Sequence, residues 1–220
     1  MDFTLTEEQQ ALRATAREFA RGEMARVAEE LERDATPLSR DWLKRYAEMG
    51  FLGVNVSVAH GGLGLGNLDA FLILEEFAKV SSAVAFPIFE SVAGPVHALA
   101  HFADEGLKQR VIPAVCAGEM IVAVAMSEPE AGTALTDLRT RAEIRGDRIV
   151  INGSKRWCSG GGHSDAYLVY CRLSDKPGAK GIGAVYVEKE ASGLTFGEQE
   201  QLMGFRGIPE SDLYFDDVSV

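Results

Sequence analysis

The sequence is poor in cysteine and in basic charge. Its three cysteines, Cys116, Cys158 and Cys171, show no C-x-x-C spacing, which argues against a disulfide framework and against a zinc site. Lys and Arg number 22 against 33 Asp and Glu, and the formal net charge of −11 repels a phosphate backbone. We therefore expect no bound metal, no nucleic-acid partner and a reducing, cytoplasmic location.

Long apolar runs are also missing. The first ten residues, MDFTLTEEQQ, are acidic where a signal peptide is basic and then apolar. The most apolar stretch, residues 83–100, is interrupted by Pro87, Glu90 and Pro95, so we expect no membrane span. What remains, 46% hydrophobic and 25% charged residues in a chain of 220, is typical of a globular protein with one or two domains.

The period of the apolar residues changes near Gly118. Before it, apolar residues recur every three or four positions, which predicts helices. After it the period is two and β-branched residues are frequent, which predicts strands. We therefore predict an α+β protein, with an all-α helical domain at residues 1–118 and an antiparallel β-barrel domain at residues 119–220.

Local signals place some of these elements. Thr6 and Gln9 have the spacing of a capping box, so the first helix should begin at Thr6. A single helix is expected over 88–102. In the second half, Gly146-Asp147 and Asn152-Gly153 predict two tight turns of a three-stranded meander.

Two motifs have plain explanations. Residues 61–66, GGLGLG, precede a predicted helix and could hold an anion on free N–H groups. Their spacing differs from G-x-G-x-x-G and no βαβ strand precedes them, so a turn is the favoured interpretation. His97 and His101 have the i, i+4 spacing of zinc ligands, but no third ligand is evident, so two ordinary helix residues are favoured. The sequence contains no G-x-S-x-G motif that would indicate a hydrolase.

Two polar segments are better candidates for a site. Residues 125–133, AMSEPEAGT, follow a predicted strand with exposed N–H groups and two hydroxyls, which suits a polar heterocycle or a phosphate. Residues 157–162, WCSGGG, end the meander with a large aromatic ring, a hydroxyl and three glycines. A flat ring could stack on Trp157 while the hydroxyl of Ser159 bonds its edge.

These segments resemble the acyl-CoA dehydrogenase family, and the resemblance covers the whole chain. The most specific match is AMSEPEAGT together with INGSKRWCSGGG at 151–162. Supporting matches are LTEEQQALR, HGGLGLG, ADEGLKQRVIPAVCAGE and LMGFRGIPESDLYFDDVSV. Members of the family have an N-terminal helical domain, a middle β-barrel and a C-terminal four-helix domain. The resemblance implies that this chain holds the first two and lacks the third.

The resemblance implies FAD as the cofactor. Main-chain N–H groups around Met126 and Ser127, with the Ser127 hydroxyl, would face the N1–C2=O edge of the flavin, and the Ser159 hydroxyl would approach N5 and O4. Thr133 would meet both FAD and the acyl-CoA substrate. The implied FAD-binding residues are Val124, Met126, Ser127, Gly132, Thr133, Trp157, Cys158 and Ser159. Two positions depart from the family pattern: Ala134 stands where Asp is usual, and Cys158 where an apolar residue such as isoleucine is common.

The implied reaction is the α,β-dehydrogenation of an acyl-CoA thioester to the enoyl-CoA, with a hydride passing to flavin N5, in fatty acid metabolism. The family's base is normally a glutamate of the C-terminal domain, so no catalytic residue is assigned here. Glu128 belongs to the flavin loop, and Glu90 is the first acidic residue we would mutate in search of another base.

Several partners follow from the same resemblance. They are the acyl-CoA substrate, an electron-transfer flavoprotein or similar acceptor, and further copies of the chain in a homodimer or homotetramer, or a chain that supplies the C-terminal domain. Two alternatives stay open: a flavin-dependent monooxygenase of the same fold, and a non-catalytic binding or assembly subunit.

Overall fold

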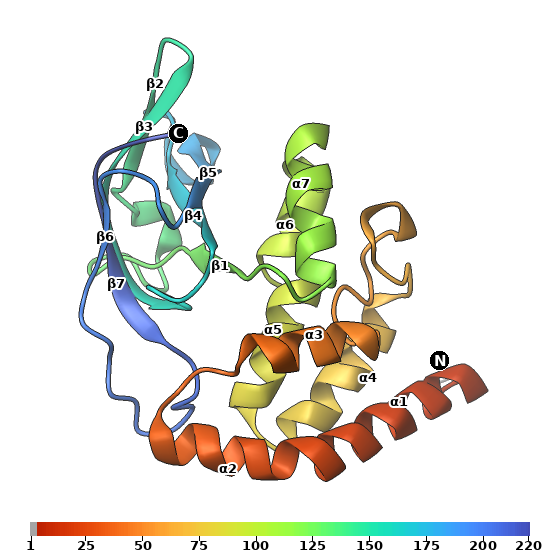
Figure 1. The fold of residues 1–220 in the computed structure, drawn as a ribbon. Coiled ribbons are helices and arrows are strands. Elements are labelled where there is room, and N and C mark those ends of the chain that lie inside the picture. The colour runs from red at the N-terminus through yellow and green to blue at the C-terminus, as the bar shows by residue number, and fades with distance from the viewer. Residues whose placement is uncertain (1–3) are drawn as a thin grey trace. The chain divides into compact units, whose positions relative to one another are not determined.

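A computed structural model describes residues 4–220, which form two compact units (Figure 1). Unit 1 comprises the residues up to Ile121 together with Leu202–Ile208, and unit 2 comprises Val122–Gln201 and Pro209–Val220. Unit 1 is helical and unit 2 is a curled β-sheet half-barrel, so the predicted α+β class is confirmed. The segment Leu202–Ile208 packs with unit 1 although it lies between two strands of unit 2 in the sequence, which no periodicity indicated.

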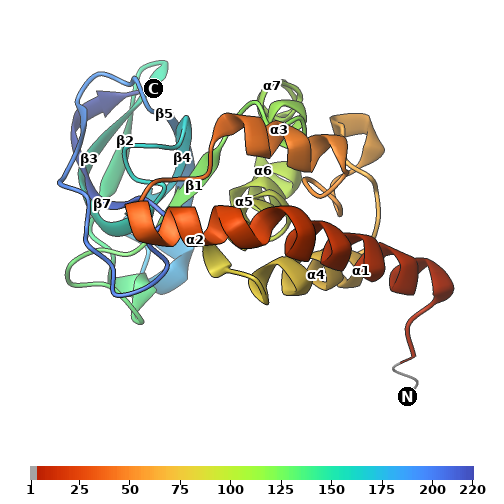
Figure 2. The same ribbon diagram turned by 60° about the horizontal axis from the view of Figure 1, so that its bottom comes forward.

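Seven α-helices make up the described part of unit 1. The first two, joined by a π-helical turn at Ala20–Met24, continue as one rod in Figures 1 and 2. The predicted capping box is present, since the Thr6 hydroxyl accepts from the Gln9 N–H and the Gln9 amide accepts from the Thr6 N–H, both at 3.2 Å. The helices are α1 Glu7–Phe19, α2 Ala25–Asp34, α3 Arg40–Glu48, α4 Asn67–Ala78, α5 Ser82–Val92, α6 Pro95–Phe102 and α7 Glu105–Cys116.

The core of unit 1 is built on four aromatic rings. Phe19, Tyr46, Phe51 and Phe77 are all at most 5% exposed, and their ring centroids lie 5.1–5.9 Å apart, mostly edge to face. The Tyr46 hydroxyl donates to the Val84 carbonyl at 3.0 Å. Helices α1, α3, α4 and α5 therefore share one core.

The single helix predicted over 88–102 is wrong. The structure has two helices there, because the chain breaks at Ala93 and Gly94 before Pro95 opens α6 at a position where its missing N–H costs nothing. A Cβ on Gly94 would lie 3.0 Å from the backbone of Glu90, so a larger residue would crowd the turn. The stretch Ser82–Phe102 is apolar enough to resemble a membrane span, yet half of it is buried in the protein.

An ion pair between a buried carboxylate and a half-exposed guanidinium joins α1 to α4. The Glu76 carboxylate, 1% exposed, accepts two hydrogen bonds from Arg17 and one from Lys79, each at 3.0 Å. The hydrogen bond from Arg17 outweighs desolvation and lowers the pKa of Glu76 to about 2. Because this pKa lies below the usual value, the pair stabilises the folded chain above about pH 4.5, and the contribution is lost as the pH falls toward 2.

Replacing Arg17 with methionine should therefore lower the free energy of unfolding by about 1–3 kcal/mol at neutral pH, with Lys79 left to compensate in part. The loss should shrink near pH 3, where Glu76 in the variant takes up a proton. Urea unfolding at both pH values measures it. Arg26→Met, which breaks the exposed pair with Glu30, is the matched control and should cost less than about 0.5 kcal/mol; equal losses in the two variants would contradict the argument.

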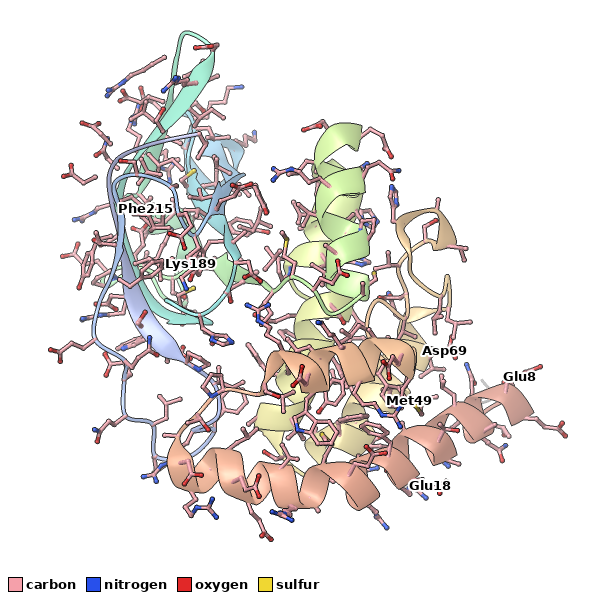
Figure 3. The ribbon with its side chains drawn as sticks, in the orientation of Figure 1. Glu8, Glu18, Met49, Asp69, Lys189 and Phe215 are labelled. Atoms are coloured by element: carbon pink, nitrogen blue, oxygen red, sulfur yellow. The ribbon has the colours of Figure 1, made fainter. Side chains whose placement is uncertain are left out.

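Unit 2 is one curled seven-stranded sheet in the order β1-β4-β2-β3-β7-β6, with β5 also paired to β4. Most pairs are antiparallel, while β4 pairs in parallel with β1 and, through Arg172 and Arg141, with β2. Tyr167, Ile151 and Phe215, the last labelled in Figure 3, are at most 4% exposed and belong to its core. The strands are β1 Val122–Ala125, β2 Arg141–Arg145, β3 Arg148–Ser159, β4 Ala166–Arg172, β5 Ile182–Glu188, β6 Leu194–Phe196 and β7 Glu210–Ser219.

The predicted turn at Gly146 is confirmed, but the one at Asn152-Gly153 is wrong. Strand β3 runs straight through these two residues, and its register against β7 shifts there. Asn152 exchanges two hydrogen bonds of 2.9 Å with Asp217 of β7. Gly153 has a φ of +141°, and a Cβ on it would lie 2.7 Å from Thr140. The Asn-Gly pair therefore marks a β-bulge with close backbone approach rather than a hairpin.

Candidate functional site

The two polar segments singled out in the sequence lie side by side in unit 2. The polar loop, residues 125–133, follows β1 and is bound to β3 by two hydrogen bonds. The Arg156 N–H donates to the Ser127 carbonyl at 3.0 Å, and Lys155 Nζ donates to the Met126 carbonyl at 2.8 Å. The loop is thus held next to the end of the strand that carries Trp157 and Ser159.

A buried ion pair between Glu128 and Lys155 anchors the polar loop to β3. Lys155 Nζ lies 2.8 Å from Glu128 Oε1, with side chains 0% and 7% exposed. The same carboxylate accepts from the N–H groups of Arg139 at 2.6 Å and Thr140 at 2.9 Å. Burial disfavours the charge of Glu128, but these hydrogen bonds outweigh it and lower the pKa of the carboxyl. Glu128 is therefore a charged anchor with its lone pairs in use, and it is not available as a base.

The polar loop also presents donors that the protein does not use. Within residues 4–220, the N–H groups of Met126, Ser127, Gly132 and Thr133 and the Ser127 hydroxyl make no hydrogen bond. Gly132 and Thr133 are exposed and Ser127 is half-buried. A cluster of unpaired donors on an anchored loop is suited to bind a ring whose edge carries hydrogen-bond acceptors.

Trp157 stands beside these donors in an unusual conformation. The register of β3 against β7 shifts between Lys155 and Cys158, and Trp157 has a φ of +53°, which costs roughly 1–2 kcal/mol for a residue with a Cβ. The result is an indole that is 61% exposed instead of pointing into the core. Bulges of this kind re-aim side chains next to functional sites.

A salt bridge between Arg156 and Asp212 lies next to the indole of Trp157. The Arg156 guanidinium lies 5.7 Å from the centroid of the Trp157 ring and bonds both oxygens of Asp212 at 2.7–3.1 Å. Asp212 also accepts from the Tyr214 hydroxyl at 3.1 Å. The hydrogen bonds from Arg156 lower the pKa of Asp212. The ring is thus preorganised by a charged pair with fixed geometry.

The three remaining predicted residues, Cys158, Val124 and Ser159, differ in their exposure and in the hydrogen bonds of their side chains. Cys158 is 3% exposed and packs in the core, with its thiol 3.4 Å from the Val124 carbonyl, so its side chain is not exposed to a ligand. Val124 is half-buried at the end of β1. Ser159 is half-buried, and its hydroxyl donates to Glu210 of β7 at 2.9 and 3.2 Å.

Both motifs with plain explanations lie in unit 1 and make contacts within it. In the loop of residues 61–66 the N–H groups are used within unit 1: Gly62, Gly64 and Leu65 donate to backbone carbonyls, and Gly66 donates to Asp69, labelled in Figure 3. The favoured turn interpretation is confirmed. The ring centroids of His97 and His101 lie 4.6 Å apart with the ring planes tilted by 40°, and no cluster of three metal-ligating side chains occurs in the described part of the chain.

Sequence reasoning missed Lys155, Arg156, Asp212 and Glu210. A signal for Lys155 was present, since it has the same parity along β3 as the core residue Ile151 and a lysine on an inward face needs an acidic partner. No such signal existed for Glu210 and Asp212, because the pairing of β3 with β7 joins residues more than fifty positions apart.

Comparison with known proteins agrees with this geometry. The sequence profile of the acyl-CoA dehydrogenase N-terminal domain matches residues 6–119, and that of the acyl-CoA dehydrogenase middle domain matches residues 123–218. The chain belongs to the acyl-CoA dehydrogenase family.

Individual relatives carry different names. The chain is 33% identical over 219 residues to mitochondrial isovaleryl-CoA dehydrogenase of Pongo abelii, covering 98% of this chain and 52% of the relative. It is 34% identical to 3-sulfinopropanoyl-CoA desulfinase of Advenella mimigardefordensis, covering 99% and 55%. The structure of butyryl-CoA dehydrogenase from Megasphaera elsdenii superposes with a TM-score of 0.91 at 28% identity, covering 100% and 58%. The chain thus spans about half the length of its relatives, and identity at this level does not select one reaction among them.

Proposed function

We propose that unit 2 binds FAD and that residues 1–118 and 119–220 are the helical and β-barrel domains of an FAD-dependent acyl-CoA dehydrogenase. The observation that supports this most is the meeting of unpaired donors on the polar loop with the exposed indole of Trp157. FAD, when bound, supplies the two-electron acceptor for removal of hydrogen from the α and β carbons of an acyl-CoA thioester.

The residues of the site have distinct roles in this proposal. Met126, Ser127, Gly132 and Thr133 offer donors to the electron-rich edge of the cofactor, while Trp157 offers a flat surface. Because the Glu128–Lys155 pair already holds the loop in place, these donors need no reorganisation when negative charge develops beside them. The proposed FAD contacts at Val124, Cys158 and Ser159 complete the set, and Thr133 is the proposed contact with acyl-CoA.

The chain covers 52% of the isovaleryl-CoA dehydrogenase and 58% of the butyryl-CoA dehydrogenase that it matches. We propose that the catalytic base comes from a region that corresponds to the unmatched part of these relatives, or from a partner chain. An electron-transfer flavoprotein or similar acceptor, assembly into a dimer or tetramer, a role in fatty acid metabolism and a cytoplasmic location are parts of the same proposal.

The 220-residue chain should bind FAD in preference to FMN, and Trp157→Ala should weaken that binding about tenfold because the stacking surface is lost. Titration of flavin fluorescence with protein measures both affinities. Trp42→Phe, in unit 1, is the matched control and should leave the affinity unchanged. Binding of FMN but not FAD, or an unchanged affinity in Trp157→Ala, would contradict the proposed cofactor site.

A further inference from the structure

Ser159 and Glu210 form a hydrogen-bonded pair that the proposed cofactor site does not explain. The two residues face each other across the β3–β7 pairing, and the Ser159 hydroxyl donates to both carboxylate oxygens of Glu210, at 2.9 and 3.2 Å. Ser159 lies two residues after the exposed Trp157 on the same strand. An acidic side chain is therefore bonded directly to a hydroxyl of the proposed site.

The surroundings of Glu210 offer no compensating charge. Its side chain is half-buried, and in the described residues no lysine, arginine or histidine forms an ion pair with it. From the loop before β7, the Glu200 N–H donates to the Glu210 carbonyl at 2.8 Å and Gln199 Oε1 accepts from the Glu210 N–H at 3.0 Å. Burial raises the pKa of Glu210, the hydrogen bond from Ser159 lowers it, and the negative charge of Glu200 raises it further.

A hydroxyl has only one hydrogen to donate. When Glu210 is ionised, that hydrogen is directed to the carboxylate, and Ser159 can offer only lone pairs to a ligand. When Glu210 is protonated, its own O–H can donate to Ser159 Oγ, and the serine hydrogen becomes free to point toward the site. Protonation of one carboxyl thus changes Ser159 from an acceptor into a donor.

We propose that Glu210 is a positioning residue that sets, by its protonation state, whether Ser159 donates or accepts a hydrogen bond at the flavin site. The inference rests on the proposed binding of FAD. The ring edge that Ser159 is expected to approach consists of acceptors in the oxidised cofactor, so the oxidised form should bind better when Glu210 is protonated. One gained hydrogen bond corresponds to about a tenfold change in affinity.

The test is a pH series of FAD binding to the 220-residue chain, with the dissociation constant and the visible absorbance band both recorded from about pH 4.5 to 8, around and above the usual titration range of a carboxyl. In the wild type the affinity should fall about tenfold as the pH rises, and the band should shift with the same midpoint. Glu210→Gln should abolish both changes, because an amide does not titrate. Glu200→Gln should keep them and move the midpoint to lower pH. Glu190→Gln, an exposed charge change on the same unit, should behave as the wild type.

The outcomes separate the two proposals. If FAD binds but Glu210→Gln titrates like the wild type, or the wild type shows no pH dependence, the inference about Glu210 is overturned while the cofactor site stands. If the chain binds no FAD at any pH, both are overturned. A Glu210→Gln variant that loses binding at every pH, with an unchanged circular dichroism spectrum, would also overturn the switch, since it would show a fixed structural role.

Discussion

Replacing Lys155 with methionine should lower the free energy of unfolding at neutral pH by about 3–5 kcal/mol, the largest stability effect we expect in this chain. Lys155 is fully buried and its partner Glu128 nearly so. Removing the cation leaves a buried carboxylate with only two backbone N–H donors, those of Arg139 and Thr140. The polar loop would also lose the bond from Lys155 to the Met126 carbonyl, so FAD affinity should fall as well.

The loss of stability in Lys155→Met should depend on pH in a defined direction. In the wild type the pKa of Glu128 is lowered, so the pair stabilises the fold above the usual carboxyl pKa and the contribution fades in acid. Without Lys155, burial should dominate and raise the pKa of Glu128. Protonation of Glu128 should then restore part of the free energy of unfolding that the variant has lost. Urea unfolding should therefore show a smaller defect at about pH 4.5 than at pH 7.

Two further variants serve as controls. Arg139→Met breaks an exposed pair with Glu130, whose side chains are 77% and 69% exposed, and should cost less than about 1 kcal/mol. The double variant Lys155→Met with Glu128→Leu removes both charges and should recover part of the loss. A Lys155→Met loss no greater than that of Arg139→Met would show that the buried pair does not hold the loop.

The 220-residue chain supplied with FAD, an acyl-CoA and a dye acceptor should form no enoyl-CoA above the rate without protein. A positioned base contributes about 10²–10⁴-fold to such a reaction, and the two acidic residues considered in the sequence, Glu128 and Glu90, each have a physical reason against that role. Glu128 is held by Lys155. Glu90 on α5 is 8% exposed, and burial disfavours its ionised form and so raises its pKa well above the usual value.

The complementary measurement joins this chain to the remaining C-terminal region of the butyryl-CoA dehydrogenase from Megasphaera elsdenii, of which it covers 58%. Acyl-CoA-dependent dye reduction should appear in the fusion. Dye reduction by the 220 residues alone, free of other polypeptides, would contradict the prediction. In that event Glu90→Gln and Glu210→Gln would show whether either residue acts as the base.

The class of fold could be predicted from the sequence, and the two candidate site segments could be proposed from it, because both depend on local properties. Amphipathic periodicity determines which half forms helices and which forms strands, and the Thr6 capping box is a contact between near neighbours in the chain. The polar loop and the Trp157 segment stood out because polar, hydroxyl-bearing and glycine-rich stretches seldom interrupt apolar strands without a reason.

Tertiary structure alone decided how the residues of these segments are placed. The Asn152-Gly153 pair carries a strong hairpin signal, yet the close approach of Thr140 and the bonds to Asp217 make it a bulge, because pairing with β7 outweighs local turn preference. The outward indole of Trp157 and the hydrogen bond from Ser159 to Glu210 also arise from that pairing. Such contacts join residues far apart in the chain, and their formation depends on burial and register, which the order of residue types does not specify.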